Sequence, residues 1–255
     1  VVRVRVRGRV RDMAVRDLLN VDTTTLEEVR RPAAWARRRT PSELVVQPAG
    51  EDSDSYHVWA ESALEVASLD VVAADRRLRA AVTQALYLEW EVTGAVVGHF
   101  PDFLIDQVGD PPLLVDCRPA ERRNELRFQA QVALTAAVAS HLGWCYELWD
   151  WPPAQVARNL QDLAFFDEVS EAVDRAAVHI ASLRGHRYDT AAGFLRTASC
   201  ETPDLNRVSV LKRALWTGRV SVNLAEPITG WTALCPGDGA DGLLLDGPWR
   251  ERLVS

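Results

Sequence analysis

The feature that most constrains the fold is a pair of apolar segments, each carrying an acidic residue, on either side of a turn sequence. The first segment runs from His99 to Ile105, and the second runs from Val115 to Pro119. Asp102 and Asp116 lie equally far from Gly109 along the chain. A hairpin that turns at this glycine would place the two carboxylates opposite each other on antiparallel strands.

Side-chain alternation gives this hairpin a charged face. Asp116 and Arg118 project from one side of their strand, whereas Val115 and Cys117 point to the other. Two carboxylates this close repel each other and favour a bound cation, and oxygen ligands suit Mg²⁺, with Mn²⁺ as a substitute. This arrangement is typical of metal-dependent phosphodiester cleavage. Pro-Asp before a strand is also ordinary turn chemistry, so a purely structural interpretation stays open.

The flanking sequence predicts α/β structure around the hairpin. The pattern of apolar residues indicates a helix over 58–72, a strand over 84–91, a helix over 120–142 ending at Gly143, and a strand over 144–149. The order α-β-β-β-α-β predicts a mixed sheet flanked by helices. Glu65 lies beside the apolar stripe of the first helix, where it is either a surface charge or a third acid of the site.

The order of these motifs resembles the restriction-endonuclease-like, or PD-(D/E)xK, nuclease core. Within that superfamily the chain looks most similar to TnsA, the endonuclease subunit of heteromeric cut-and-paste transposases, over about residues 27–165. The stretches that carry the resemblance are Ser62-Ala63-Leu64-Glu65, Gln84, Asp102-Phe103-Leu104 and Val115-Asp116-Cys117-Arg118-Pro119-Ala120.

The resemblance implies a Mg²⁺-dependent endonuclease that cuts double-stranded DNA at transposon ends. Its implied partners are a TnsB-like transposase subunit and a TnsC-like AAA+ ATPase. The implied catalytic residues are Glu65, Asp102, Asp116 and Arg118, and the implied metal ligands are Asp102, Asp116, Glu65 and the carbonyl of Cys117.

The chain departs from the family pattern at two positions. Arg118 stands where the pattern has lysine, and Asp116 stands where TnsA itself has glutamine. Arginine does not deprotonate in proteins, so Arg118 would stabilise the phosphate in the transition state or orient the nucleophile rather than act as a base. A stand-alone restriction or repair nuclease, and a catalytically weak scaffold that docks a transposase or ATPase, remain alternatives.

Charge is distributed unevenly along the chain. The net charge is −7, but residues 1–39 hold eleven arginines and five acids, a net of +6, which leaves −13 for the rest. Valine and arginine alternate at the amino terminus, which predicts an edge strand with outward arginines. We expect these arginines to contact DNA phosphates, although a merely solubilising edge is the alternative. The residues assigned to DNA contact are Arg3, Arg5, Arg7, Arg9, Arg37, Arg38 and Arg39.

The second half predicts a smaller helical domain. A boundary near Trp149–Pro153 separates a nuclease domain over 1–150 from a domain over 151–236 and a loose tail over 237–255. Helical patterns cover residues 156–166, 168–183, 188–197 and 203–216, and possible wing strands cover 219–224 and 229–234. The arrangement resembles a winged helix, and its acidity favours docking to a protein over reading DNA.

The remaining features indicate a cytoplasmic protein. The four cysteines have no CxxC spacing, so we expect reduced, buried thiols. No apolar run reaches membrane-spanning length, and no signal segment opens the chain. His99 lies three residues before Asp102, where it could touch the site, but we expect it to have a packing or capping role.

Overall fold

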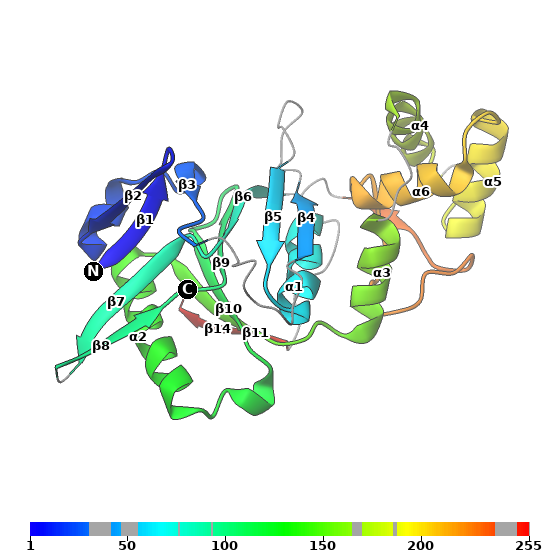
Figure 1. Cartoon of the computed structure of the whole chain (residues 1–255). Helices are drawn as coiled ribbons and strands as arrows, with labels where there is room; N and C mark the ends of the chain where they lie inside the picture. The colour runs from blue at the N-terminus through cyan, green and yellow to red at the C-terminus, as the bar shows by residue number, and fades with distance from the viewer. Residues whose placement is uncertain are drawn as a thin grey trace. The chain divides into compact units, whose positions relative to one another are not determined.

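The computed structural model describes residues 1–30, 42–46, 56–75, 77–92, 94–164, 170–185, 188–237 and 249–254, which form a mixed α/β structure (Figure 1). The chain divides into two compact units. The first contains Val1–Ala73, Arg77–Trp151 and Gly247–Ser255, and the second contains Ala74–Arg76 and Pro152–Asp246.

One sheet of the first unit is built around the amino-terminal strand. Its order is β2-β1-β7-β8, with β3 also paired to β1. The strands are β1 (Val2–Val6), β2 (Arg9–Met13), β3 (Leu26–Glu27), β7 (Leu86–Val92) and β8 (Ala95–His99). The short turns η1 (Val15–Asn20) and η2 (Thr23–Thr25) connect β2 to β3.

The alternation predicted over residues 2–11 is confirmed only for β1, which is not an edge strand, since residues 9–13 form a second strand in which Val10 is exposed rather than packed. Val2 and Val4 are fully buried, and the chain turns at Arg7 and Gly8, which both have positive φ, as a tight hairpin requires. β1 pairs with β2 along one side and with β7 and β3 along the other. Alternating side chains leave the backbone free to pair on both sides, so the sequence pattern does not distinguish an edge strand from an interior one.

The second sheet of this unit carries the predicted hairpin. Its order is β14-β11-β10-β9-β6, and β10 and β11 are parallel whereas the other neighbours are antiparallel. We call it the central sheet. Its strands are β6 (Leu78–Thr83), β9 (Phe103–Gln107), β10 (Leu113–Cys117), β11 (Cys145–Trp149) and β14 (Arg250–Val254).

The register of β9 and β10 confirms the predicted hairpin. Val115 pairs with Phe103 and Leu113 with Ile105, and Gly109 has the positive φ of a turn glycine. Extending this register by one residue places Asp102 opposite Asp116. The amino end of β9 and the carboxyl end of β10 therefore bring the two acids together.

Several predicted elements are displaced. The helical pattern over 58–72 divides into β5 (Tyr56–Ala60), which pairs with β4 (Ser42–Val46), and α1 (Ala63–Ala74). The strand predicted over 84–91 is β7, but it belongs to the amino-terminal sheet, and the unpredicted β6 pairs with β9 instead. The predicted helix over 120–142 begins with the turn η3 (Ala120–Arg122) and continues as α2 (Leu126–Leu142).

Both sheets and α2 share one apolar core in the first unit. It includes Val4 of β1, Leu88 of β7, Leu104 of β9, Leu114 of β10 and Phe128 of α2. Gly143 ends α2 with the left-handed conformation predicted for a helix terminus. This core fixes the amino-terminal sheet against the face of the central sheet that carries Leu114.

Four helices dominate the second unit, as their sequence patterns predict. They are α3 (Ala154–Ala164), α4 (Glu171–Ser182), α5 (Ala191–Glu201) and α6 (Arg207–Trp216). The predicted wing is wrong in its register. β12 (Val220–Ser221) pairs with β13 (Cys235–Pro236), not with residues 229–234. Thr190 forms a bridge with Ala233 and Ala191 bonds to Thr232, so contacts with the start of α5 occupy part of the expected second wing strand.

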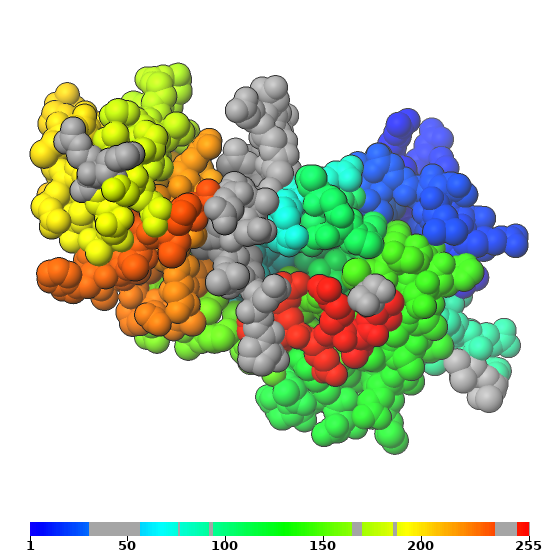
Figure 2. Space-filling model, turned by 180° about the vertical axis from the view of Figure 1, so that it is seen from behind, coloured from blue at the N-terminus to red at the C-terminus, as the bar shows by residue number. Residues whose placement is uncertain are grey.

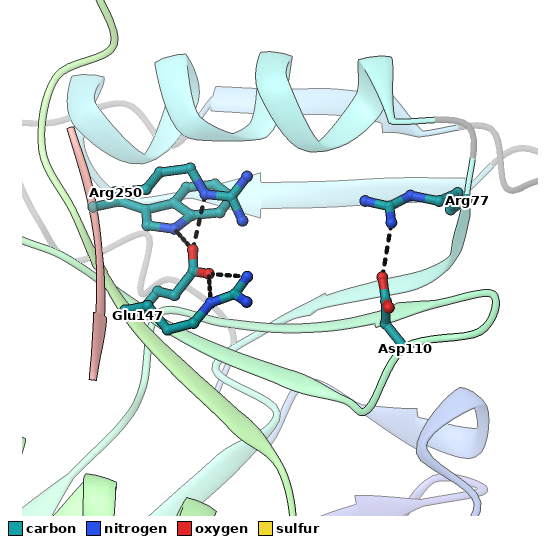
Figure 3. A network of polar contacts seen from close by, with 6 residues as sticks. Arg77, Asp110, Glu147 and Arg250 are labelled. Carbon is teal, nitrogen blue, oxygen red and sulfur yellow. Dashed lines mark hydrogen bonds and ion pairs between the residues drawn. The ribbon is translucent and has the colours of Figure 1, made fainter. Parts of the chain in front are cut away.

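The carboxyl terminus differs from the loose tail predicted over 237–255. Arg250–Val254 form β14, which pairs with β11 and lies at the surface beside residues of the first unit (Figure 2). The buried carboxylate of Glu147 accepts hydrogen bonds from Arg250 at 2.8 Å, Arg252 at 3.0 Å and the Trp149 indole at 2.7 Å (Figure 3). This residue on β11 therefore anchors a strand that composition alone indicated to be loose.

Two further expectations concern the cysteines and the membrane. All four cysteines are free, but the expected burial is wrong, since Cys117 and Cys145 are partly buried and Cys200 and Cys235 are exposed. Among the helices of the described residues, none combines the length and the apolar composition needed to span a bilayer.

The anchoring of β14 predicts an acid-sensitive contribution to stability. Burial alone would raise the pKa of Glu147, but the charge of Arg250 and the hydrogen bonds lower it below its ordinary value of 4.5. The stabilisation is therefore fully present above that pH and is lost as the pH falls through the lowered pKa. We expect Glu147→Gln to reduce the free energy of unfolding at pH 7 by about 3 kcal/mol, because it removes the charge that the largely buried guanidinium of Arg250 faces.

The measurement is chemical unfolding of both proteins between pH 7 and pH 3. The difference between them should shrink below pH 4.5. Glu251→Gln is the matched control, since this neighbouring carboxylate is exposed and pairs with Arg123. It should cost about 1 kcal/mol or less. Equal losses in the two variants would contradict the anchoring role of Glu147.

Candidate functional site

Asp102 and Asp116 meet at the end of the β9–β10 pair. The Oδ2 atom of Asp102 accepts a hydrogen bond from the backbone N–H of Cys117 at 2.7 Å. Burial, followed by the nearby charges of Asp116 and Glu65, raises the pKa of Asp102 well above its ordinary value, and the Cys117 hydrogen bond only partly opposes this. The carboxylate is therefore held in a site that already contains negative charge.

Glu65 reaches this site from the first turn of α1. Its Oε2 accepts from the backbone N–H of Glu61 at 2.7 Å, and its Oε1 accepts from the Ser62 hydroxyl at 2.6 Å. The Ser62 hydroxyl in turn accepts from the N–H of Glu65 at 3.2 Å. These contacts form a helix cap that fixes the buried Glu65 side chain. The structure thus brings Glu65 within electrostatic range of Asp102 and also gives it a capping role.

Asp116 is held by two residues that the sequence did not assign to the site. Both of its carboxylate oxygens lie 2.9 Å from Nε2 of His99, and the hydroxyl of Tyr146 donates to Oδ2 at 2.5 Å. Asp116 is only 2 % exposed. The packing or capping role expected for His99 is therefore wrong, because its ring contacts the site carboxylate directly.

The Tyr146 hydroxyl keeps its proton in this environment. Burial, together with the charge of Asp116 and its hydrogen bond, raises the pKa of Tyr146 far above its ordinary value. The phenol is therefore a hydrogen-bond donor to Asp116. Sequence alternation places Tyr146 and Leu148 on one face of β11, but its pairing with Asp116 depends on the parallel register of β10 and β11.

Arg118 directly follows β10, two residues after Asp116, and its guanidinium contacts Glu125 and Phe128. Its Nη2 atom pairs with Glu125 at 2.5 Å, and its guanidinium lies 5.0 Å from the ring centre of Phe128. The buried Nε of Arg118 has no hydrogen-bond partner within the described residues. The basic residue of the predicted motif is therefore close to the site and engaged by the start of α2.

Cys117 projects to the opposite face, as predicted. Its thiol donates to the Ser68 hydroxyl on α1 at 3.3 Å. Burial, together with the charge of Asp102, raises the pKa of the Cys117 thiol well above its ordinary value. A protonated thiol is a poor metal ligand, so the backbone carbonyl is the atom of this residue that suits a hard cation.

The donor set fits a magnesium ion held mainly by water and substrate. Among the described residues, no group of three or more His, Cys, Asp or Glu side chains is arranged to hold a metal ion. Mg²⁺ commonly binds through one or two carboxylates plus water and phosphate oxygens, rather than within a cage made only of protein atoms. Asp102 and Asp116 supply such a pair, and the charges of Asp116 and Glu65, which add to burial in raising the pKa of Asp102, are charges that a cation would offset.

The arginines assigned to DNA contact have different environments. Arg7 and Arg9 are exposed at the β1–β2 turn, whereas Arg3 pairs with Asp12 at 2.6 Å. Arg5 donates to the carbonyl of Val29 and lines a cavity of about 460 Å³. The three remaining candidates, Arg37, Arg38 and Arg39, lie outside the described residues.

Gln84 is a further residue beside the site. Its N–H donates to the carbonyl of Asp102 at 3.0 Å, and its φ of 47° is unusual for a residue other than glycine. Its Oε1 is buried and has no hydrogen-bond partner in the part of the chain that the structure describes. Strained and unsatisfied groups of this kind concentrate at functional sites.

Because Asp102 is buried beside the charges of Asp116 and Glu65, we expect its carboxylate to destabilise the metal-free protein. In a metal-free buffer at pH 7, Asp102→Asn should raise the free energy of unfolding by about 1 kcal/mol or more, because the neutral amide removes a buried charge that faces other carboxylates. Asp106→Asn is the matched control on the same strand, because Asp106 is buried but pairs with Arg79 and accepts from Thr23. The control should be destabilised, and destabilisation of both variants in urea unfolding would refute the crowding.

Comparisons with known proteins add no family to this geometry. No family model matches the chain, and no curated protein matches its sequence. The case for a function therefore depends on the residues of the site and on their arrangement.

Proposed function

We propose that this chain is a Mg²⁺-dependent DNA endonuclease subunit of a heteromeric cut-and-paste transposase, which hydrolyses phosphodiester bonds at transposon ends. The observation that carries the proposal is the convergence of Glu65, Asp102 and Asp116. They come from α1 and from the adjacent ends of β9 and β10, and the pKa of Asp102 is raised by its burial and then by the charges of Asp116 and Glu65. Separate elements that converge on one anionic point are typical of a catalytic metal site.

The order of the elements supports a restriction-endonuclease-like core. The sequence α1, β6, β9, β10, α2, β11 follows the order α-β-β-β-α-β. β6, β9 and β10 form an antiparallel meander, and β11 returns parallel to β10 after the crossover through α2. The β7–β8 hairpin is then an insertion that belongs to the amino-terminal sheet.

Each site residue has a distinct chemical role in this proposal. Asp102, Asp116 and the Cys117 carbonyl would hold Mg²⁺, and Glu65 would complete the ligand set or position a water molecule. Mg²⁺, when bound, would offset the charge that develops on the phosphate during hydrolysis. Arg118 keeps a positive charge at all relevant pH values, so it would pair with a phosphate oxygen rather than accept a proton.

The basic amino terminus would position the DNA. Arg7 and Arg9 are exposed, and the excess of arginine in residues 1–39 contrasts with the acidic remainder of the chain. Phosphate contacts of this kind give affinity without sequence specificity. Arg3 would need to exchange its contact with Asp12 for a phosphate, which an exposed ion pair permits at little cost.

The second unit would dock a protein partner. Two cations of α6 are engaged within the unit, since Arg213 pairs with Asp174 and Arg207 donates to Ser199. Trp231 is 88 % exposed, and exposed aromatic side chains are enriched at protein interfaces. The partner would be the transposase subunit or the AAA+ ATPase of the same element.

A catalytically weak scaffold of the same fold is the second candidate. The pairing of Arg118 with Glu125 favours it, because the guanidinium is already engaged by a carboxylate that is not one of the proposed metal ligands. Measurements of DNA cleavage distinguish the two candidates.

The nuclease proposal predicts cleavage that needs both the metal and the acids. Purified protein with its partner subunits should nick transposon-end DNA in Mg²⁺ or Mn²⁺ and not in a chelator. Asp102→Asn should lower the rate by roughly 10²–10³ or more, because the ligand charge is lost at the phosphate. Asp106→Asn, assayed below its unfolding temperature, should keep most of the activity. Full activity of the Asp102→Asn protein would contradict the assignment of Asp102 as a metal ligand.

The position of Arg118 predicts a graded series. Arg118→Ala should reduce cleavage by roughly 10²–10³, as expected for losing one transition-state donor, whereas Arg118→Lys should retain it. Glu125→Gln should release the guanidinium and raise the rate by up to about fivefold, because an exposed ion pair contributes about 1 kcal/mol or less. Identical nicking rates in all three variants would exclude a role for Arg118 in catalysis.

A further inference from the structure

Asp116 is the carboxylate of the site that side chains from two other strands contact. It is almost fully buried, and it accepts contacts from His99 and Tyr146. An ionised carboxylate in such a place needs donors, since burying it unpaired costs several kcal/mol. These two side chains therefore fix the orientation of the Asp116 carboxylate.

The three residues come from three strands in two sheets. His99 ends β8 of the amino-terminal sheet, whereas Asp116 and Tyr146 belong to β10 and β11 of the central sheet. Asp116 lies on the face of β10 that also carries Leu114, the face that packs against the shared core. The carboxylate is thus fixed from both sheets rather than by its own strand alone.

The contacts on the two oxygens are unequal. Oδ2 is shared between His99 at 2.9 Å and Tyr146 at 2.5 Å, whereas Oδ1 has only the His99 contact at 2.9 Å among the contacts described. A carboxylate has about four lone-pair positions, so Oδ1 keeps the greater capacity to accept a further partner.

We propose that His99 and Tyr146 are positioning residues that fix the Asp116 carboxylate so that Oδ1 faces the metal ion. The inference rests on the proposed function, because it requires the site to bind a divalent cation. Neither residue touches the reacting phosphate. They act through Asp116, in the way that hydrogen bonds from outer residues commonly orient metal ligands.

The experiment measures Mn²⁺ affinity directly, by electron paramagnetic resonance of free Mn²⁺, in the full chain without DNA. Tyr146→Phe removes one donor while keeping the ring, and His99→Leu removes the other. Each should weaken Mn²⁺ binding roughly 10- to 100-fold, the range typical for loss of an outer-shell partner. His99→Gln keeps an N–H donor and should recover most of the affinity.

A matched control separates positioning from stability. Tyr188 is also buried, and its hydroxyl donates to the carbonyl of Ile180 at 2.8 Å within the second unit. Tyr188→Phe should lower the thermal unfolding midpoint without changing Mn²⁺ affinity. Loss of stability alone would therefore not explain weaker Mn²⁺ binding in Tyr146→Phe or His99→Leu.

The outcomes distinguish this inference from the proposed function. If the wild-type protein binds Mn²⁺ and cleaves DNA but Tyr146→Phe and His99→Leu bind Mn²⁺ with unchanged affinity, the positioning role is overturned and the nuclease proposal stands. If the wild-type protein neither binds Mn²⁺ nor cleaves, both are overturned. Weakened affinity in the two variants, with recovery in His99→Gln, supports the positioning role.

Discussion

Repulsion among the carboxylates at the end of the β9–β10 pair is the constraint on which the rest of the site depends. Asp102 lies opposite Asp116, and Glu65 adds a third charge from α1. Such a cluster persists only if the surrounding structure supplies donors. Cys117 N–H holds Asp102, the cap at Ser62 holds Glu65, and His99 and Tyr146 hold Asp116.

The hydrogen-bond partners of these carboxylates come from both sheets of the first unit. The amino-terminal sheet brings His99 to Asp116, and the shared apolar core fixes that sheet against β9, β10 and α2. The start of α2 also holds Arg118 through Glu125 and Phe128. At the edge of the central sheet formed by β14, Glu147 of β11 binds Arg250 and Arg252. Buried carboxylates thus hold together the candidate site and also attach the edge strand β14 to the central sheet.

The sequence predicted local features well and long-range pairing less well. The hairpin register was predicted correctly from the position of Gly109 midway between Asp102 and Asp116, because the turn determines which residues pair in a short antiparallel hairpin. The strand over residues 84–91 was predicted correctly, but it was assigned to the wrong sheet. Alternation of side chains does not indicate which strand lies beside it. β14 was missed because its contact with Glu147 spans about 100 residues, and Tyr146 was missed because its role follows from parallel register.

The most direct measurement of the central claim is the thermal unfolding midpoint as a function of Mg²⁺ concentration at constant ionic strength. A ligand that binds only the folded state stabilises it by RT ln(1 + [L]/Kd). The midpoint of the wild-type protein should rise with Mg²⁺, whereas the midpoint of Asp102→Asn should be higher without metal and should stay constant as Mg²⁺ is added. Parallel curves for the two proteins, or no response in the wild type, would contradict a metal site at these carboxylates.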